Sequence, residues 1–146
     1  MIILVLAVCL LVAFAGSLVV RFLPISEKTL TAWDGFGPSE LGLHEFDGGA
    51  KLVVDGGAAP EQTLADFAKI IAATARTTPA ETALKDTRVF VTRSKWVGFP
   101  DVVTLWVAEG RVHVMSHLVY GLYDLGVNKA RLTQWAARAQ LQVNPD

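Results

Sequence analysis

The sequence predicts an α+β domain that follows one N-terminal transmembrane helix. Residues 2–20 are apolar and uncharged over a length that fits a bilayer. The rest of the chain alternates segments of helical and of strand periodicity, separated by short turns. The expected order is β-α-β-β-β-α, a mostly antiparallel sheet of about four strands with two helices packed on one face.

The N-terminal segment from Ile2 to Val20 has the length and composition of a membrane span. Of its 19 residues, 13 are Ile, Leu, Val or Phe. A helix of this length extends over roughly 28 Å, close to the thickness of the hydrocarbon core. Every Lys, Arg, Asp and Glu lies from Arg21 onward. We therefore expect an anchor over residues 1–23 with the lipid bilayer as its partner.

The N-terminal segment could be a cleaved secretory signal or an uncleaved anchor, and its orientation in the membrane is also open. Ala13, Phe14 and Ala15 form an AxA pattern, but the basic region that precedes a secretory signal is absent, which favours an uncleaved anchor. Arg21 and Lys28 follow the segment, and this charge bias favours a cytoplasmic domain.

Residues 24–49 are expected to form an irregular lead-in, because they are rich in Gly, Pro and Ser without a sustained period. The domain itself is expected over 50–146. Its first strand, Lys51–Val54, lies between two Asp-Gly-Gly-Ala turn signals.

A first amphipathic helix begins at Pro60, a residue that suits the first helical position, and is expected to end near Thr77, before Thr78 and Pro79. Its apolar residues have helical spacing: Leu64, Phe67, Ala68, Ile71 and Ala75.

Three strands and a second helix follow. Residues 88–93 and 111–120 alternate polar and apolar types, 102–107 is a continuous apolar run, and the short joint at 108–110 predicts a hairpin. The second helix begins near Val127 with Leu132, Trp135, Ala136 and Ala139 on its inner face. Arg131 and Arg138 are expected on its solvent side.

Antiparallel order places the loops after 93 and after 120 at the same end of the sheet. Any binding site is expected there, formed by Trp96, Phe99, Asp101, Tyr123, Asp124, Asn128 and Arg131. A structural interpretation is also open, in which Gly98 and Gly126 serve turns and Asp124 or Asn128 caps the second helix. In the functional interpretation, Trp96 and Phe99 form an apolar surface flanked by cations, for a partner or for the bilayer.

The segments TRSKWVGFPDVV (92–103) and GLYDLGVNKAR (121–131) resemble the bacterial and plastid family called domain of unknown function 1499 (DUF1499). The resemblance covers about 60–140. The residues that match its pattern are Gly98, Phe99, Pro100, Asp101, Gly121, Asp124, Leu125, Gly126, Val127, Asn128 and Arg131. The chain departs from the family at 115–120, where members resemble an alternating Arg/Ser strand, so a row of anion-binding arginines is not expected there. The resemblance implies a bacterial inner-membrane protein with a periplasmic domain, and no established activity.

The sequence shows no strong arrangement of catalytic or metal-binding residues. Ser116 and His117 are neighbours on a strand and therefore point to opposite faces, while His113 and His117 lie roughly 13 Å apart. We expect no metal and no cofactor, and the histidines are expected at the surface or with satisfied partners. The net charge of −1 gives no global basic field, so no nucleic-acid partner is expected.

These observations lead to two functional expectations. The first is a membrane-anchored, non-enzymatic binding or assembly module that serves the cell envelope or a membrane complex as an accessory. The alternative is a small ligand-binding or hydrolytic domain that uses Asp101, Asp124 and Asn128.

Overall fold

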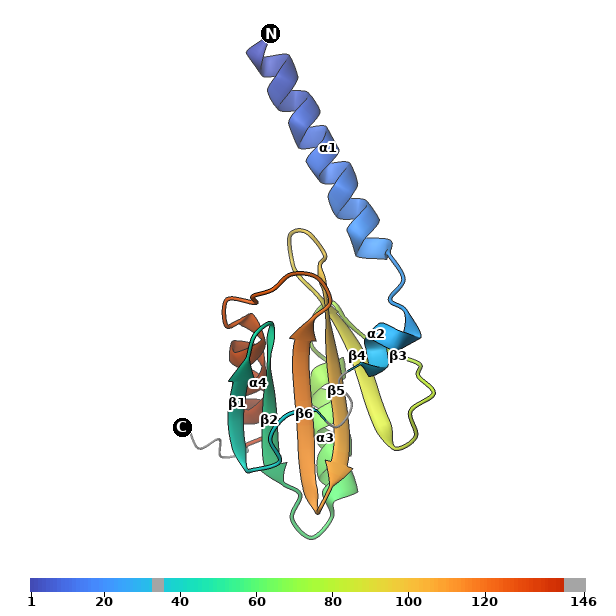
Figure 1. Ribbon diagram of the computed structural model, residues 1–146, viewed down its shortest axis with the longest axis vertical. Coiled ribbons are helices and arrows are strands. Elements are labelled where there is room, and N and C mark those ends of the chain that lie inside the picture. Colours follow the sequence, from blue (N-terminus) through green and yellow to red (C-terminus); the bar gives the residue numbers. More distant parts are fainter. Residues whose placement is uncertain (33–35, 141–146) are drawn as a thin grey trace.

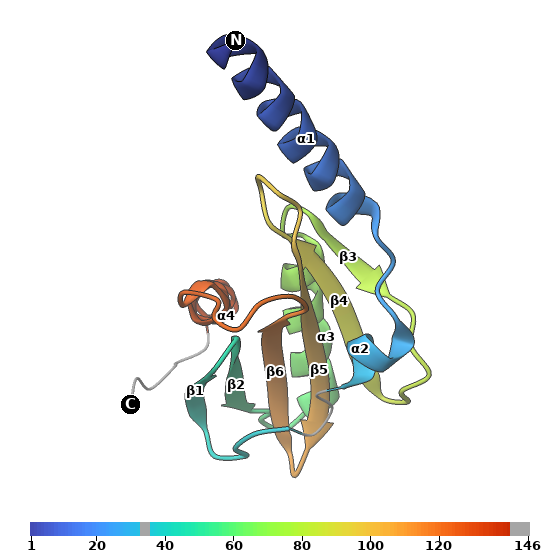
Figure 2. The same cartoon turned by 45° about the horizontal axis from the view of Figure 1, so that its top comes forward.

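The computed structural model describes residues 1–32 and 36–140, so the last six residues of the predicted domain lie outside this description. A long helix leads into an antiparallel sheet backed by two further helices (Figures 1 and 2). The helices are α1 (Ile2–Phe22), α2 (Glu27–Thr31), α3 (Pro60–Ala72) and α4 (Val127–Arg138). The strands are β1 (Gly42–Phe46), β2 (Gly49–Asp55), β3 (Thr77–Ala80), β4 (Thr87–Arg93), β5 (Pro100–Ala108) and β6 (Arg111–Leu118).

The sheet has six strands in the order β1-β2-β6-β5-β4-β3, and all neighbours are antiparallel. The α+β class is confirmed, but the expected number of about four strands is too low. β1 lies in the predicted irregular lead-in. The first helix ends at Ala72, about one turn before the predicted end near Thr77, and Arg76 adopts a positive φ of 60° in the turn that follows. β3 begins directly after this turn, at Thr77.

Both α3 and α4 pack on one face of the sheet, as predicted. Phe67 of α3 and Trp135 of α4 are fully buried there against the strands. The indole Nε1 of Trp135 donates a hydrogen bond of 2.8 Å to Thr74 Oγ1, which links α4 to the segment after α3.

The lead-in covers part of the other face of the sheet. Leu30 of α2 packs with Val91 and Val102 in a second apolar cluster. Lys51 is 1% exposed, and its Nζ donates to the carbonyl of Phe36 at 2.7 Å. Burial lowers the pKa of Lys51 below its ordinary value. A segment predicted to be a linker thus contributes directly to the sheet's packing.

Two histidines that were expected at the surface or with satisfied partners are buried on this same face. His113 is 1% exposed and stacks on Trp106 with ring centroids 5.1 Å apart, and His117 is 3% exposed. Desolvation lowers the pKa of both imidazoles, so they favour the neutral form. They complete the packing on the side of the sheet opposite α3 and α4.

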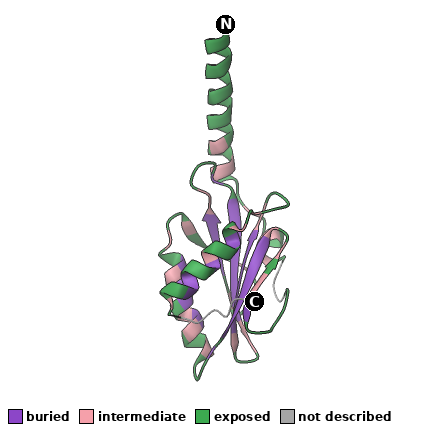
Figure 3. Cartoon of the chain, turned by 90° about the vertical axis from the view of Figure 1, so that its left-hand side faces the viewer, coloured by how far each residue is buried: buried purple, intermediate pink, exposed green. Residues whose placement is uncertain are grey.

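The helix α1 stands apart from this core. It is long and apolar enough to cross a membrane, with a mean hydropathy of 3.0, and it is exposed along most of its length (Figure 3). Only its last turns become half-buried, where Ser17, Val20 and Arg21 meet the domain. These contacts involve one of the two loops that the sequence singles out.

Candidate functional site

The loop between β4 and β5 (94–99) and the loop between β6 and α4 (119–126) lie at the same end of the sheet, as predicted. Asp101 at the start of β5 pairs with Leu118 at the end of β6. The amide of Val119 then donates to the carbonyl of Pro100 at 3.3 Å. The helix α1 leaves the domain at this same end (Figure 1).

The β4–β5 loop is organised around one serine. Ser94 Oγ accepts hydrogen bonds of 3.0 Å from the amides of Gly98 and Phe99. Gly98 has φ +84°, a conformation that side chains with a Cβ rarely adopt, and an added Cβ would lie 3.0 Å from Arg21 Cβ. The resulting tight turn places Trp96 at its tip, where the indole is 80% exposed.

The same loop holds the end of α1. Arg21 Nη2 donates to the carbonyl of Trp96 at 3.2 Å. In the opposite direction, Arg93 donates at 3.0 Å to the carbonyls of Val20 and Leu23. Carbonyls at a helix C-terminus lack helical partners and carry partial negative charge, so the Arg93 guanidinium suits this position. Reciprocal bonds therefore connect α1 to the loop.

Large apolar side chains cluster on these two loops. We call this surface the apolar lip. It comprises Trp96, Phe99, Leu122, Tyr123 and Leu125, which are 80%, 45%, 78%, 70% and 94% exposed. Lys95 Nζ lies 4.8 Å from the centroid of the Trp96 ring, so one cation flanks the lip as expected.

A buried polar cluster lies behind the lip, between the sheet and α4. Arg131 Nη1 forms a 2.8 Å ion pair with Asp101, and the two side chains are 13% and 8% exposed. The same nitrogen donates to Asn128 Oδ1 at 2.8 Å, and Ser116 Oγ also donates to that amide oxygen. The buried residues Asn128 and Ser116 thus fix the orientation of Arg131.

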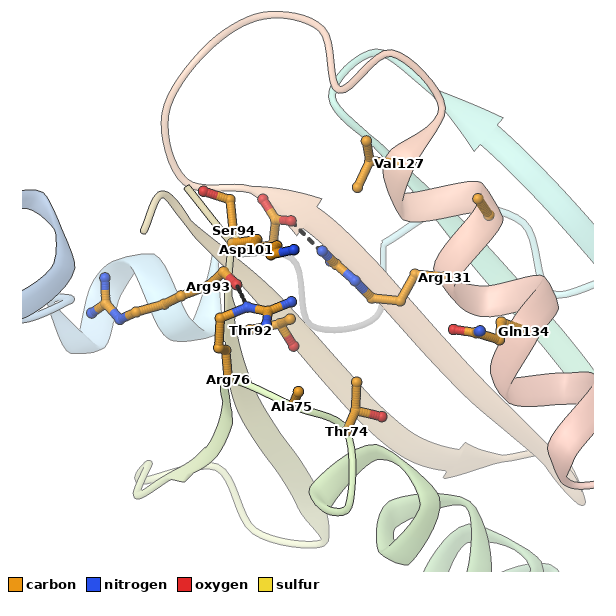
Figure 4. Close-up of a pocket in the computed structure, with 12 residues that line it drawn as sticks. Thr74, Ala75, Arg76, Thr92, Arg93, Ser94, Asp101, Val127, Arg131 and Gln134 are labelled. Atoms are coloured by element: carbon orange, nitrogen blue, oxygen red, sulfur yellow. Dashed lines mark hydrogen bonds and ion pairs between the residues drawn. The ribbon is translucent and has the colours of Figure 1, made fainter. Parts of the chain in front are cut away.

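The expectation that Arg131 faces solvent is wrong. It lies three residues after Asn128 and four before Trp135, both fully buried, so it sits at the edge of the buried stripe of α4. Its side chain extends from there to Asp101 (Figure 4). Burial raises the pKa of the Asp101 carboxyl, and the adjacent Arg131 guanidinium acts in the opposite direction. The pair is therefore sensitive to the loss of either partner.

Asp124 has the capping role that the structural interpretation assigns to it. Its two carboxylate oxygens accept from the amides of Gly126 at 3.0 Å and Asn128 at 2.7 Å. Gly126 provides the left-handed entry to α4 with φ +76°. Asn128 lies inside the helix and bonds the polar cluster instead. Asp101, Asp124 and Asn128 thus lie close together. Trp96, Phe99 and Tyr123 lie on the lip and are not part of this polar group.

Both sequence motifs lie at one end of the fold, and residues 50–139 match the family described as "Protein of unknown function (DUF1499)". The chain belongs to the DUF1499 family. The match begins in β2 and ends just after α4, so it contains the whole loop end of this DUF1499 protein. No curated protein and no solved structure matches the chain.

The structure also contains a feature that the sequence analysis missed. A cleft of about 520 Å³ opens between α4 and the segment that joins α3 to β3 (Figure 4). Arg76 lies on its wall, and Lys95 and Arg131 line it as well. Arg76 was assigned to the end of a helix, which hid this arrangement. The Thr-Thr-Pro run that follows it marks a helix end near Thr77 and does not indicate that α3 already ends at Ala72.

Proposed function

We propose that this DUF1499 protein is a membrane-anchored, non-enzymatic binding or assembly module that serves the cell envelope or a membrane complex through its apolar lip. In this proposal α1 is the anchor, the membrane is the bacterial inner membrane, and the domain lies on the periplasmic side. The observation that carries it is the position of the lip: the β4–β5 loop, which bears Trp96 and Phe99, is hydrogen-bonded to the end of α1 through the carbonyls of Trp96 and Val97.

The exposure of the lip supports a binding role. Soluble surfaces rarely gather several large apolar side chains without a partner, and such patches mark contacts with proteins or membranes. Trp and Tyr are also the side chains enriched at protein interfaces and at the bilayer surface. Because α1 joins the lip directly, a bilayer around α1 would lie at the height of Trp96. The expected partner is therefore a membrane protein with a segment exposed at that height.

The use of the polar residues favours a non-enzymatic role. Asp101 is paired with Arg131, Asp124 accepts two amide hydrogens at the start of α4, and Asn128 is buried. Acid–base catalysis needs groups that reach a bound substrate, and here these groups are engaged in holding the loop end together.

Photo-crosslinking in cells tests the proposal. A photoreactive amino acid replaces Trp96 in one variant and Arg88 in a control variant. Arg88 is also exposed, but lies at the opposite end of β4. We expect a discrete protein adduct from position 96 and none from position 88. Equal adducts from both positions, or none from position 96, would contradict the proposal.

A separate reporter experiment tests the compartment. Alkaline phosphatase fused to the C-terminus is active only outside the cytoplasm, whereas a fluorescent protein fused there folds in the cytoplasm. Phosphatase activity without fluorescence is the expected result. Fluorescence without phosphatase activity would place the domain in the cytoplasm, as the charge bias at Arg21 and Lys28 favours.

A further inference from the structure

The cleft beside α4 differs from the lip in chemistry and carries an inference of its own. Four cationic residues line it, Arg76, Arg93, Lys95 and Arg131, with Asp101 as the carboxylate among the lining residues. We name this feature the cationic cleft. We propose that the cationic cleft binds a phosphate group, held between the guanidinium groups of Arg76 and Arg131.

The two guanidinium groups approach the same space from opposite walls. Arg76 extends from the segment before β3 and Arg131 from α4, whereas Arg93 points away from the cleft (Figure 4). Arg93 is occupied elsewhere, because its guanidinium bonds the carbonyls at the end of α1. None of these cations comes from strand β6.

Both arginines retain donors for a ligand. Arg76 Nε donates to the carbonyl of Arg93 at 3.1 Å, which orients the guanidinium and leaves its two Nη groups without an acceptor among the described residues. Arg131 uses Nη1 for Asp101, Asn128 and Ser116. Its Nε and Nη2 have no acceptor in the described part of the chain. Two oriented forks with unused donors match the geometry of an oxyanion.

Charge and size favour phosphate over a carboxylate. The Asp101 carboxylate already offsets one cation, so the cleft keeps an excess of positive charge that a dianion would neutralise. A single fork satisfies a carboxylate, whereas two forks from opposite walls can donate to several oxygens of a tetrahedral group. The volume of about 520 Å³ also accommodates a molecule larger than the anion itself.

The location admits two sources of phosphate. The cleft adjoins the β4–β5 loop, which is bonded to α1, so a phospholipid headgroup and a free phosphate compound could both reach it. The inference is independent of the proposed function, because Arg76 belongs to the cleft and not to the lip, while Trp96 belongs to the lip and not to the cleft. Substitution of Arg76 should therefore leave the contacts of the lip intact, and substitution of Trp96 should leave phosphate binding intact.

The test uses the full chain in phosphatidylcholine nanodiscs, titrated with pyrophosphate in a calorimeter. We expect saturable binding that weakens about tenfold in Arg76→Gln, since one charge-assisted fork is lost. Arg88→Gln removes the same charge at the opposite end of β4, and this variant should bind pyrophosphate as tightly as the wild type does. Arg131→Lys keeps a cation beside Asp101 but loses the fork, and should also weaken binding.

A second measurement identifies the source. Native mass spectrometry compares retention of phosphatidylglycerol with retention of phosphatidylcholine by the wild type, Arg76→Gln and Arg88→Gln. Selective retention that requires Arg76 indicates a lipid headgroup, and pyrophosphate binding alone indicates a free phosphate compound; both support the site. No binding of either probe, or equal binding by wild type and Arg76→Gln, overturns it.

Discussion

Replacing Arg131 with methionine removes the cation that faces Asp101 while keeping a long side chain on α4. The Asp101 side chain is 8% exposed and cannot turn to solvent without disturbing the start of β5. An ionised carboxylate left in such a place loses its compensation, and breaking a buried pair in this way costs about 3–5 kcal/mol of the free energy of unfolding. We expect a loss in that range at pH 7.

The pH dependence of this loss makes the prediction specific. Burial raises the pKa of Asp101, so the folded state binds its proton more readily than the unfolded state does. Stability therefore falls as pH rises through the window between the unfolded and folded pKa, with a slope of about 1.4 kcal/mol per pH unit. Without Arg131, which lowers the pKa of Asp101, the pKa of this carboxyl in the folded state rises further. Acidification from pH 7 to 5 should then recover part of the lost stability in the variant, because protonation removes the unpaired buried charge.

Urea unfolding followed by tryptophan fluorescence measures this effect, since Trp135 is fully buried in the wild type. Arg138→Met, on the exposed side of the same helix, is the control and should change stability by less than about 0.5 kcal/mol. The double variant Asp101→Asn with Arg131→Met should lose the additional pH slope. A loss of under about 1 kcal/mol, or an equal loss at pH 5 and pH 7, would refute a buried, charge-dependent pair.

Two further predictions concern the contacts of α1 and of the lead-in. Gly98→Ala should destabilise the protein by about 1–2 kcal/mol and separate the loop from Arg21, as measured by amide hydrogen exchange and by a spin-label distance. Gly110→Ala shares the positive φ but has open space around it, so it should cost stability without moving α1. Lys51→Met removes a buried cation whose pKa is lowered by burial. The melting temperature at pH 7 should stay unchanged or rise. The wild type gains stability at high pH because Lys51 loses its proton more readily in the folded state, and this gain should be smaller in the variant, while amide hydrogen exchange increases around Phe36. A large fall in melting temperature would contradict this prediction.

Strong local patterns explain what could be predicted from the sequence. The helix from Pro60 and the hairpin of β5 and β6 each combine a clear period with turn signals, and their order alone places both motif loops at one end. Short elements lacked such patterns. β1 has five residues and β3 has four, and each is a strand because a neighbour supplies its hydrogen bonds.

In the candidate site, too, some residues could be predicted from the local sequence and others could not. Exposed aromatic residues on turn-rich segments can be recognised locally, so Trp96 and Phe99 were expected at the surface. The role of Arg131 depends on Asp101, thirty positions away in the chain, and helical periodicity gives no information about such a partner. The cationic cleft was missed for the same reason, since Arg76 and Arg131 become neighbours only through the packing of α3 and α4 on the sheet.

The height of the lip relative to the bilayer is the most direct test of the central claim that α1 anchors the domain with its lip at the membrane surface. A spin label is attached in Leu125→Cys and, separately, in Arg88→Cys, both with Cys9→Ser, in nanodiscs. Collision rates with oxygen and with a water-soluble nickel complex then report the depth of each label. We expect the label at 125 to lie at the lipid–water interface and the label at 88 to lie in water. Equal, fully aqueous exposure of both labels would contradict it.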